Sequence, residues 1–214
     1  MSLLESLQNQ SQIIIRQRRE LIELLGFESR NKYEICDENG NVIGFCAEQQ
    51  KGLLGILLRQ FLGHWRRFDL HFFNNDRREV LIVKHPFRFF FQRLEIHTAD
   101  GKYLGALQQR FAFIRKKFDL ENSLGQVIMS VNSGFFQFWT FPFKKGSVEV
   151  AVIRKKWSGG LKEIFTDADN FQISFNYREL NELERTLILA SGVFIDLQYF
   201  EAKGRGGYGE ALFD

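Results

Sequence analysis

A short pattern of apolar and polar residues occurs three times along the chain. Each copy is an apolar-acidic-apolar triplet with a glycine five residues after its last member: Tyr33–Ile35 with Gly40, Leu94–Ile96 with Gly101, and Phe118–Leu120 with Gly125. The alternation is typical of strands, and a glycine that accepts a positive φ is typical of the tight turn between them. The pattern therefore predicts three β-hairpins.

A looser fourth copy runs from Phe68 to Val83, and its turn is predicted at Asn74, Asn75 and Asp76. Hairpins in series form an antiparallel meander, and the outer edges of a meander must be closed or covered. We therefore expect a mainly β (α+β) fold, built as a barrel or a sandwich.

Two other segments have the spacing of helices. Near the N-terminus, residues Ser11–Leu25 contain a near-helical series with charges between its members, and Gly26 stands where a helix would stop. The series consists of Ile14, Arg18, Leu21, Ile22 and Leu25. We expect an amphipathic N-terminal helix over this segment.

The second helical segment covers residues 177–200 and begins with polar residues. From Thr186 to Phe200 it is apolar on every side, with Leu187, Ile188, Leu189, Val193, Phe194 and Ile195 among its members. These fifteen residues, interrupted by Gly192 and Asp196, are short for a membrane span, which needs about 20. The first interpretation is a helix threaded through the barrel interior. The alternative is insertion of this helix into a membrane.

The 214 residues contain two prolines and no compositional linker, which favours one continuous domain. We expect an N-terminal helical segment (1–26), a barrel (27–200) whose central helix is 178–200, and a flexible tail (201–214). Cys36 and Cys46 flank one predicted turn and could face each other on paired strands, but two thiols make no disulfide framework. Because the N-terminus lacks a secretory pattern, we expect a reducing, cytoplasmic location.

Charge is distributed unevenly along the chain. Residues 51–160 hold 19 Lys and Arg against 8 Asp and Glu, whereas acidic residues are in excess on both sides of this stretch. The same stretch holds most of the 24 phenylalanines. It is suited to anionic lipid head groups or to nucleic-acid phosphates. A solvated strand face is the alternative.

Two stretches, Glu20–Ile35 and Arg154–Phe171, carry a family resemblance. The second is the more specific, because seven of its residues fall in a distinctive order: Trp157, Gly159, Phe165, Asp167, Asp169, Asn170 and Phe171. From about residue 13 to residue 200 the sequence resembles the phospholipid scramblase family. The resemblance implies a tubby-like fold, which is a closed antiparallel barrel of about twelve strands around a buried hydrophobic C-terminal helix.

The resemblance also implies a function. The family is associated with calcium-stimulated, energy-independent movement of phospholipids between leaflets, which implies an anionic phospholipid membrane as partner and a location peripheral to or anchored at the inner face of the plasma membrane. The sequence has no catalytic constellation of a conventional enzyme and no evident small-molecule substrate. A fold does not carry its function along with it. A soluble tubby-like binding or regulatory module for phosphoinositides, nucleic acid or a protein is therefore the alternative.

Animal members of the family carry a lipidated, cysteine-rich segment where this chain has His85–Arg93, which contains no cysteine. Palmitoylation is therefore not implied. Aromatic rings beside cations can insert at a bilayer interface while the cations hold lipid phosphates. The predicted lipid contacts are Phe87, Arg88, Phe89, Phe90, Phe91 and Arg93. A buried strand of phenylalanines with exposed arginines is the alternative.

The family's proposed calcium segment starts at Asp167, uses alternate positions to Phe175, and ends at the twelfth position. The resemblance thus implies Ca2+ as a cofactor, with Asp167 and Asp169 as candidate metal ligands. However, Phe171 stands at the fifth position and Arg178 at the twelfth, where an EF-hand-type loop uses carboxylates. The alternative is a turn followed by a strand over Phe171–Phe175.

The remaining candidates carry weaker signals. Gly52–Gly63 is apolar enough for a membrane-dipping loop, although an element that covers the core explains it at least as well. His64, His71, His85 and His97 show no metal-ligand spacing and are expected to be structural. Gly204–Gly209 matches a dinucleotide-binding motif in form, but it follows a helix and not a strand. The run Arg154–Lys156 has too few cations to indicate nuclear import.

Overall fold

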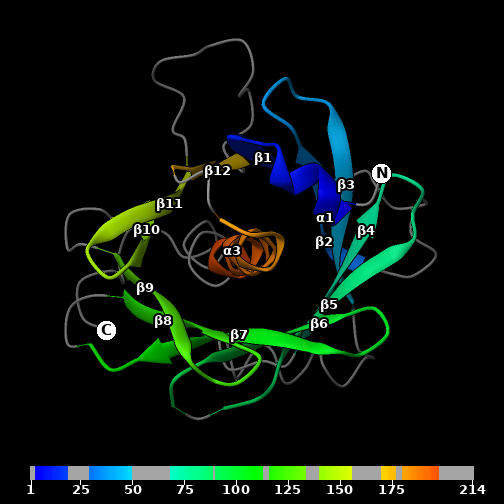
Figure 1. The fold of residues 1–214 in the computed structure, drawn as a ribbon. Helices are drawn as coiled ribbons and strands as arrows, with labels where there is room; N and C mark the ends of the chain where they lie inside the picture. The colour runs from blue at the N-terminus through cyan, green and yellow to red at the C-terminus, as the bar shows by residue number, and fades with distance from the viewer. Residues whose placement is uncertain are drawn as a thin grey trace, which may run out of the picture.

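A computed structural model describes residues 3–18, 29–49, 68–88, 90–112, 116–133, 140–155, 170–176 and 180–197. In this part of the chain, twelve strands form one closed antiparallel barrel, and a helix runs along its axis (Figure 1). The strands are β1 (Gln12–Gln17), β2 (Ser29–Cys36), β3 (Val42–Gln49), β4 (Phe68–Asn74), β5 (Glu79–His85), β6 (Arg93–Thr98), β7 (Tyr103–Arg110), β8 (Lys116–Asn122), β9 (Val127–Ser133), β10 (Thr140–Lys145), β11 (Val148–Lys155) and β12 (Asn170–Phe175); the helices are α1 (Leu3–Gln8) and α3 (Glu182–Ile195).

Each strand pairs with the strands before and after it in the sequence, and β1 pairs with β12 to close the ring. Closure removes the free edges of the meander. The predicted architecture, a closed antiparallel barrel around a hydrophobic C-terminal helix, is therefore confirmed.

All four predicted hairpins are present. Gly40, Gly101 and Gly125 lie in the turns with φ of 86°, 90° and 75°, as their positions in the pattern predicted. In the fourth hairpin, the positive φ of 59° falls on Arg77, one residue after the predicted turn residues. Asn74 stabilises this turn, because its Oδ1 accepts a hydrogen bond from the backbone N–H of Arg78.

The two ends of the barrel differ in their connections. Because every consecutive pair of strands is antiparallel, the connections after even-numbered strands all lie at one end, and those after odd-numbered strands at the other. Connections of two to five residues follow the even strands β2 to β10: 37–41, 75–78, 99–102, 123–126 and 146–147. We call this end the turn rim. Five to eighteen residues separate the strands at the opposite end, which we call the connection rim.

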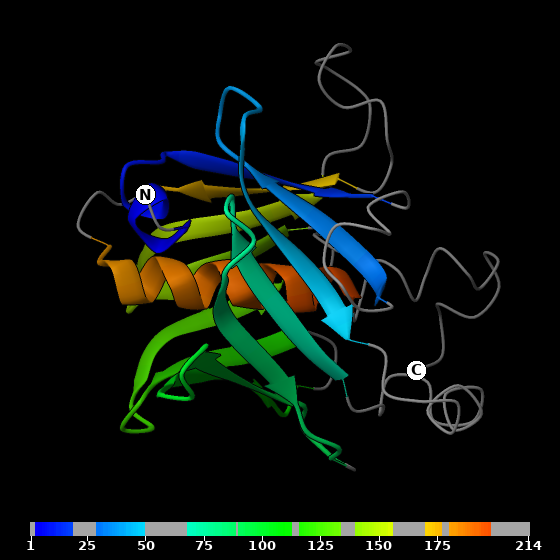
Figure 2. The same cartoon turned by 90° about the vertical axis from the view of Figure 1, so that its right-hand side faces the viewer.

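Helix α3 fills the barrel from one rim to the other, as Figure 2 shows. It starts beside the turn rim, where the Lys145 ammonium lies 2.6 Å from the Glu184 carboxylate. Toward the connection rim, the Phe194 ring lies 5.4 Å from the ring of His85, the last residue of β5. Asn181 and Glu184 form a capping box that fixes the start of the helix.

The apolar side chains of α3 are buried in the barrel core. Those predicted to be buried or inserted are all 1% exposed or less: Leu187, Ile188, Leu189, Val193, Phe194 and Ile195. The structure thus agrees with the barrel-interior interpretation of this segment. Among the described helices, none is long and apolar enough to cross a membrane.

The N-terminal helix predicted over Ser11–Leu25 is wrong for Gln12–Gln17, which form strand β1. Ile13 and Ile15 point into the core opposite Ile173 and Phe171 of β12. The period of two set by these β-branched residues overrides the helical spacing counted through Ile14. The helix α1 lies earlier, at Leu3–Gln8. Strand β1 pairs with β12 and so belongs to the barrel, whereas the division of the chain at residue 26 stays a prediction.

The two cysteines do not face each other. Cys46 lies opposite Tyr33 and belongs to the main core, whereas Cys36 lies opposite Val42 and packs with Ile14 in a separate small cluster. The connection 37–41 is short, so it pairs Cys36 at the end of β2 with Val42 at the start of β3, and Cys46 lies four residues further along β3. Burial raises the pKa of both thiols.

Candidate functional site

Aromatic side chains are exposed at the connection rim between β5 and β6. Phe90 is 80% exposed and Phe91 is 46% exposed, and Arg88 is exposed beside them, whereas Phe87 is half-buried. Phe89 lies outside the described residues. Large exposed apolar side chains side by side call for a purpose. The exposed rings of Phe90 and Phe91 do not fit the alternative of a buried strand, and membrane contact stays a prediction.

A second exposed ring lies at the same rim. Phe111 follows directly on β7 and is 74% exposed. The backbone N–H of Gln109 donates to the carbonyl oxygen of Gln92 at 2.8 Å. Phe90 lies two residues before Gln92, and Phe111 lies two residues after Gln109. Both rings therefore extend from the same pair of neighbouring strands. The sequence contained a signal for Phe111, since residues 110–117 are rich in phenylalanines and cations, as residues 87–93 are.

The backbone that carries Phe91 is held in an unusual conformation. Phe91 has a φ of 44°, in the left-handed region that a large side chain rarely adopts. The Gln108 side-chain amide donates to the carbonyl oxygens of Phe91 and Gln92, at 3.4 and 3.3 Å. The N–H of Gln92 donates to Oε1 of Gln109 at 2.9 Å. These bonds fix the segment to β7 just before it joins β6.

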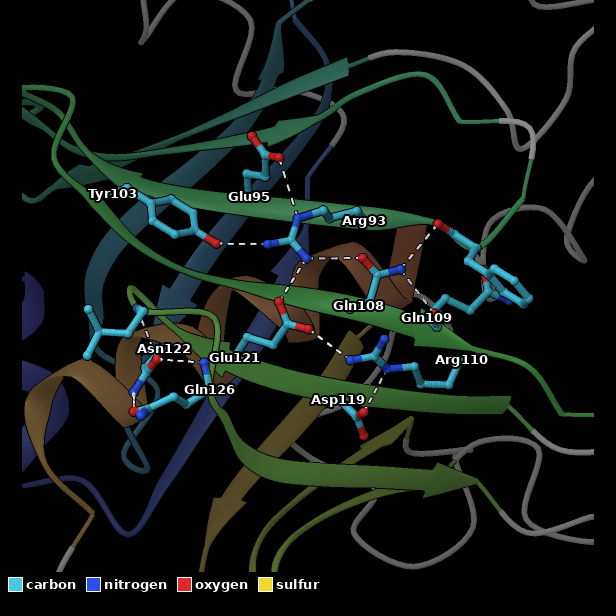
Figure 3. Close-up of polar contacts among 12 residues, drawn as sticks. Arg93, Glu95, Tyr103, Gln108, Gln109, Arg110, Asp119, Glu121, Asn122 and Gln126 are labelled. Atoms are coloured by element: carbon cyan, nitrogen blue, oxygen red, sulfur yellow. Dashed lines mark hydrogen bonds and ion pairs between the residues drawn. The ribbon is translucent and has the colours of Figure 1, made fainter.

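Arg93 lies at the centre of a polar network on the outer face of β6, β7 and β8 (Figure 3). Its guanidinium donates to Glu121 at 2.8 Å, to Gln108 at 3.0 Å and to the Tyr103 hydroxyl at 3.0 Å, and it lies 3.5 Å from Glu95. The side chain is only 18% exposed. Burial acts to lower the pKa of Arg93, but the hydrogen bond to Glu121 and its neighbours raise it overall.

Glu121 connects this network to a second arginine. Its other carboxylate oxygen accepts from Arg110 at 2.9 Å, and Arg110 also donates to Asp119 at 2.7 Å. Arg93 stands two residues after Phe91, and Arg110 directly precedes Phe111. Of the two arginines predicted as lipid contacts, the structure therefore places Arg88 in solvent and Arg93 among four protein oxygens. Arg93 also donates to Gln108, whose amide in turn donates to the carbonyl oxygen of Phe91.

The candidate calcium ligands Asp167 and Asp169 lie outside the described residues, as does Arg178. Residues 170–176 are described, and Asn170–Phe175 form strand β12, which pairs with β1 and β11. Phe171 and Ile173 point into the core, so neither side chain nor paired backbone forms an EF-hand-type loop over these positions. In the described part of the chain, no group of three or more His, Cys, Asp or Glu could hold a metal ion.

The described histidines take part in packing and side-chain pairs. His71 contacts the Glu79 carboxylate and lies 3.3 Å from Gln49. His85 stacks on Phe68 with ring centroids 4.7 Å apart, and His97 lies beside Tyr103 at 5.3 Å. The other candidates named from the sequence lie outside the described residues: Gly52–Gly63, His64, Lys156, Trp157 and Gly204–Gly209.

The fold defines a closed antiparallel barrel wrapped around a hydrophobic helix, and the site adds aromatic rings and a cation at one rim. The chain belongs to the Scramblase family, whose model matches residues 1–202. It is 32% identical to phospholipid scramblase 1 of Rattus norvegicus over 94% of this chain and 63% of the rat protein. It is 31% identical to phospholipid scramblase 2 of Bos taurus over 92% of this chain and 71% of the bovine protein.

Two further proteins are similar to this chain at lower identity. The chain is 26% identical to altered inheritance rate of mitochondria protein 25 of Saccharomyces cerevisiae, over 94% of this chain and 74% of the yeast protein. A solved Arabidopsis thaliana protein aligns with a TM-score of 0.47 at 9% identity, over 86% of this chain and 91% of that one. The chain spans slightly less than two thirds of the length of the rat and human scramblase 1 proteins.

Proposed function

We propose that this chain is a phospholipid scramblase-like protein that binds anionic membranes through its connection rim. The observation that carries the proposal is the exposure of Phe90 and Phe91 beside the exposed cation Arg88. Moving one Phe side chain out of water is worth about 1.5–3 kcal/mol. A nearby cation adds about 1 kcal/mol on an anionic surface. Rings and cation together therefore favour a bilayer interface over water.

The names of the relatives point to the lipid class. Several of them are called phospholipid scramblases, and on this basis we assign phospholipids as the lipid that the rim contacts. We place the protein at the inner face of the plasma membrane, where anionic phospholipids supply the negative surface potential.

Movement of phospholipids between leaflets is the further activity that the family suggests. The barrel interior is occupied by α3, whose apolar residues are buried, so the described residues leave no open polar path through the interior for a head group. Such a path would have to cross about 30 Å of hydrocarbon. We therefore assign lipid movement to the outer surface of the barrel, where an inserted rim disturbs the packing of lipids.

Liposome co-sedimentation tests the membrane proposal. The chain is mixed with neutral or anionic liposomes at low and high salt, with and without calcium, and compared with a variant that combines Arg88→Gln and Phe90→Ala. The expected result is binding to anionic liposomes that weakens with salt and is largely lost in the double variant.

A matched double variant at the turn rim serves as the control. Arg78 and Leu124 are also exposed, so Arg78→Gln with Leu124→Ala removes one cation and one apolar side chain from the other end. This control is expected to bind as the unmodified chain does. Salt-dependent binding to DNA or RNA with none to liposomes would refute the proposal. A fluorescent-lipid assay in the same liposomes then tests lipid movement separately.

A further inference from the structure

We infer that Phe111, directly after β7, and Lys117, near the start of β8, form a second contact point for anionic phospholipid bilayers, side by side with Phe90. This inference rests on the proposed membrane function and deepens it. It assigns a role to two residues that lie outside the segment between β5 and β6.

The first support is the distribution of exposed apolar side chains. In the described part of the chain, the large exposed ones fall in two groups. The connection rim has only aromatic members, Phe90, Phe91 and Phe111, whereas the turn rim has the aliphatic residues Leu124, Val127 and Val148. Aromatic rings are suited to the membrane interface in particular.

The second support is strand register. Gln92 and Gln109 are joined by a backbone hydrogen bond. Phe90 precedes Gln92 by two residues and Phe111 follows Gln109 by two, so both are equally far from this bond toward the connection rim. Neighbouring strands lie about 5 Å apart. The two rings therefore start from adjacent points on the rim, and a flat bilayer can meet both of them at once.

The third support is charge. Residues 84–93 and 108–121 together contain seven Lys and Arg but only two carboxylates, Asp119 and Glu121. Both carboxylates are held by arginines in the outer network. Lys117 is exposed and lies opposite Arg110 in the β7–β8 register. A cation at this position is placed to meet a lipid phosphate beside the Phe111 ring.

The fourth support is rigidity. Arg110, directly before Phe111, is fixed to β8 through Asp119 and Glu121. Glu121 also holds Arg93, which follows the other aromatic segment. A contact point on a rigid strand end loses little conformational freedom on binding. The shared carboxylate thus keeps the two contact points at a constant separation.

The test compares Phe111→Ala, Phe90→Ala and Lys117→Gln with Leu124→Ala, which is equally exposed at the turn rim. Binding to phosphatidylcholine vesicles with and without phosphatidylserine is measured at low and high salt. Phe111→Ala and Phe90→Ala are each expected to weaken binding about tenfold, at either salt concentration. Lys117→Gln is expected to weaken it about fivefold at low salt and little at high salt. Leu124→Ala is expected to leave binding unchanged.

A second measurement follows the position of the side chain. Phe111→Cys and Leu124→Cys are labelled with an environment-sensitive fluorophore, since the native Cys36 and Cys46 are buried. A blue shift on anionic vesicles is expected at position 111 and none at position 124. If Phe90→Ala weakens binding while Phe111→Ala does not, and the label at 111 stays in water, the inference is overturned and the proposed function stands. If the unmodified chain binds no vesicles, both fail.

Discussion

Tyr33 on β2 donates its hydroxyl to Oδ2 of Asp196, which follows the last turn of α3, at 3.0 Å. Both residues are buried, and 163 positions separate them in the sequence. The bond joins the barrel wall to the helix that fills it. It therefore fixes the rotation of α3 at the end of the helix that faces the connection rim.

Replacement of this tyrosine tests the link. Tyr33→Phe keeps the ring but takes one donor away from a buried carboxylate, and the free energy of unfolding should fall by about 1–3 kcal/mol. Urea denaturation measures the change, and an unaltered m-value would indicate that the compactness of both states is kept. Asp196→Asn retains an acceptor oxygen and should cost less. Equal stability of Tyr33→Phe and the unmodified chain would contradict the prediction.

Gly105 on β7 should not tolerate a side chain. A Cβ at this position would lie 2.2 Å from the carbonyl oxygen of Glu121, a backbone atom on the paired strand. Gly105→Ala is therefore expected to lower the free energy of unfolding by about 3 kcal/mol or more. Gly101→Ala is the control, because nothing lies within 4 Å of its Cβ and only the positive φ is disfavoured. Its expected cost is about 1 kcal/mol. A reversed order of the two costs would refute the assignment.

Arg185 holds α1 against α3. Its guanidinium donates to the carbonyl oxygens of Leu7, Gln10 and Leu180, at 3.0, 2.7 and 3.2 Å, and the residue is buried. Arg185→Met keeps the volume but leaves these carbonyls without that donor, and about 2 kcal/mol of stability should be lost. Hydrogen exchange should become faster at residues 3–10.

An arginine on the surface provides the control for this change. Arg18 pairs with Glu34 at 3.0 Å and is partly exposed. Arg18→Met is expected to cost at most about 1 kcal/mol and to leave exchange at residues 3–10 unchanged. Slow exchange of α1 in Arg185→Met would show that other contacts hold this helix.

The Asp37 carboxylate at the turn rim should make the free energy of unfolding depend on pH. Its carboxylate accepts from the backbone N–H groups of Asn39 and Asn41 and from the Asn41 side chain, at 2.9, 2.8 and 2.9 Å. Burial acts to raise the pKa of Asp37, but these hydrogen bonds outweigh it and lower the pKa. Since the folded pKa lies below the unfolded one, the stabilisation is complete above about pH 4 and is lost as the pH falls through the folded value.

The difference in unfolding free energy between the unmodified chain and Asp37→Ala measures this contribution. We expect about 1 kcal/mol at neutral pH, and a smaller difference in acid below about pH 4. A difference that stays constant from pH 7 to pH 3 would contradict the assignment to the carboxylate.

The two arginines beside the exposed rings should behave differently. Arg93→Met removes the partner of Glu121, a nearly buried carboxylate, and should cost about 3 kcal/mol of stability. Arg88→Met should change stability by less than about 0.5 kcal/mol, since the residue is exposed. Only the second variant should weaken liposome binding without a change in thermal unfolding. Weaker binding by Arg93→Met at unchanged stability would instead support direct contact of Arg93 with lipid.

Local pattern predicted the hairpins well, because each turn is determined by residues within it. Gly40, Gly101 and Gly125 adopt a positive φ that other residues rarely adopt, so their spacing also located the flanking strands. The segment around Ile14 was harder to predict. Its partners in β2 and β12 are distant in the sequence, and pairing with them decides between helix and strand.

The candidate site was predictable only in part. The composition of residues 87–93 indicated aromatic membrane contacts; Phe90 and Phe91 are exposed, and their contact with lipid stays a prediction. Composition could not separate the two arginines, because the partners of Arg93 come from β7 and β8. The proximity of Phe111 to Phe90 likewise follows from strand pairing, which the sequence pattern did not align across this connection.

The direction of α3 determines where a fused protein would lie. Residues joined ahead of α1 start at the turn rim, whereas residues that follow Leu197 start from the end of α3 nearer the connection rim. A reporter domain attached at the N-terminal side would thus be held on the face of the barrel that points away from the proposed bilayer. The same reporter attached after α3 would begin close to the lipid and compete with it for space.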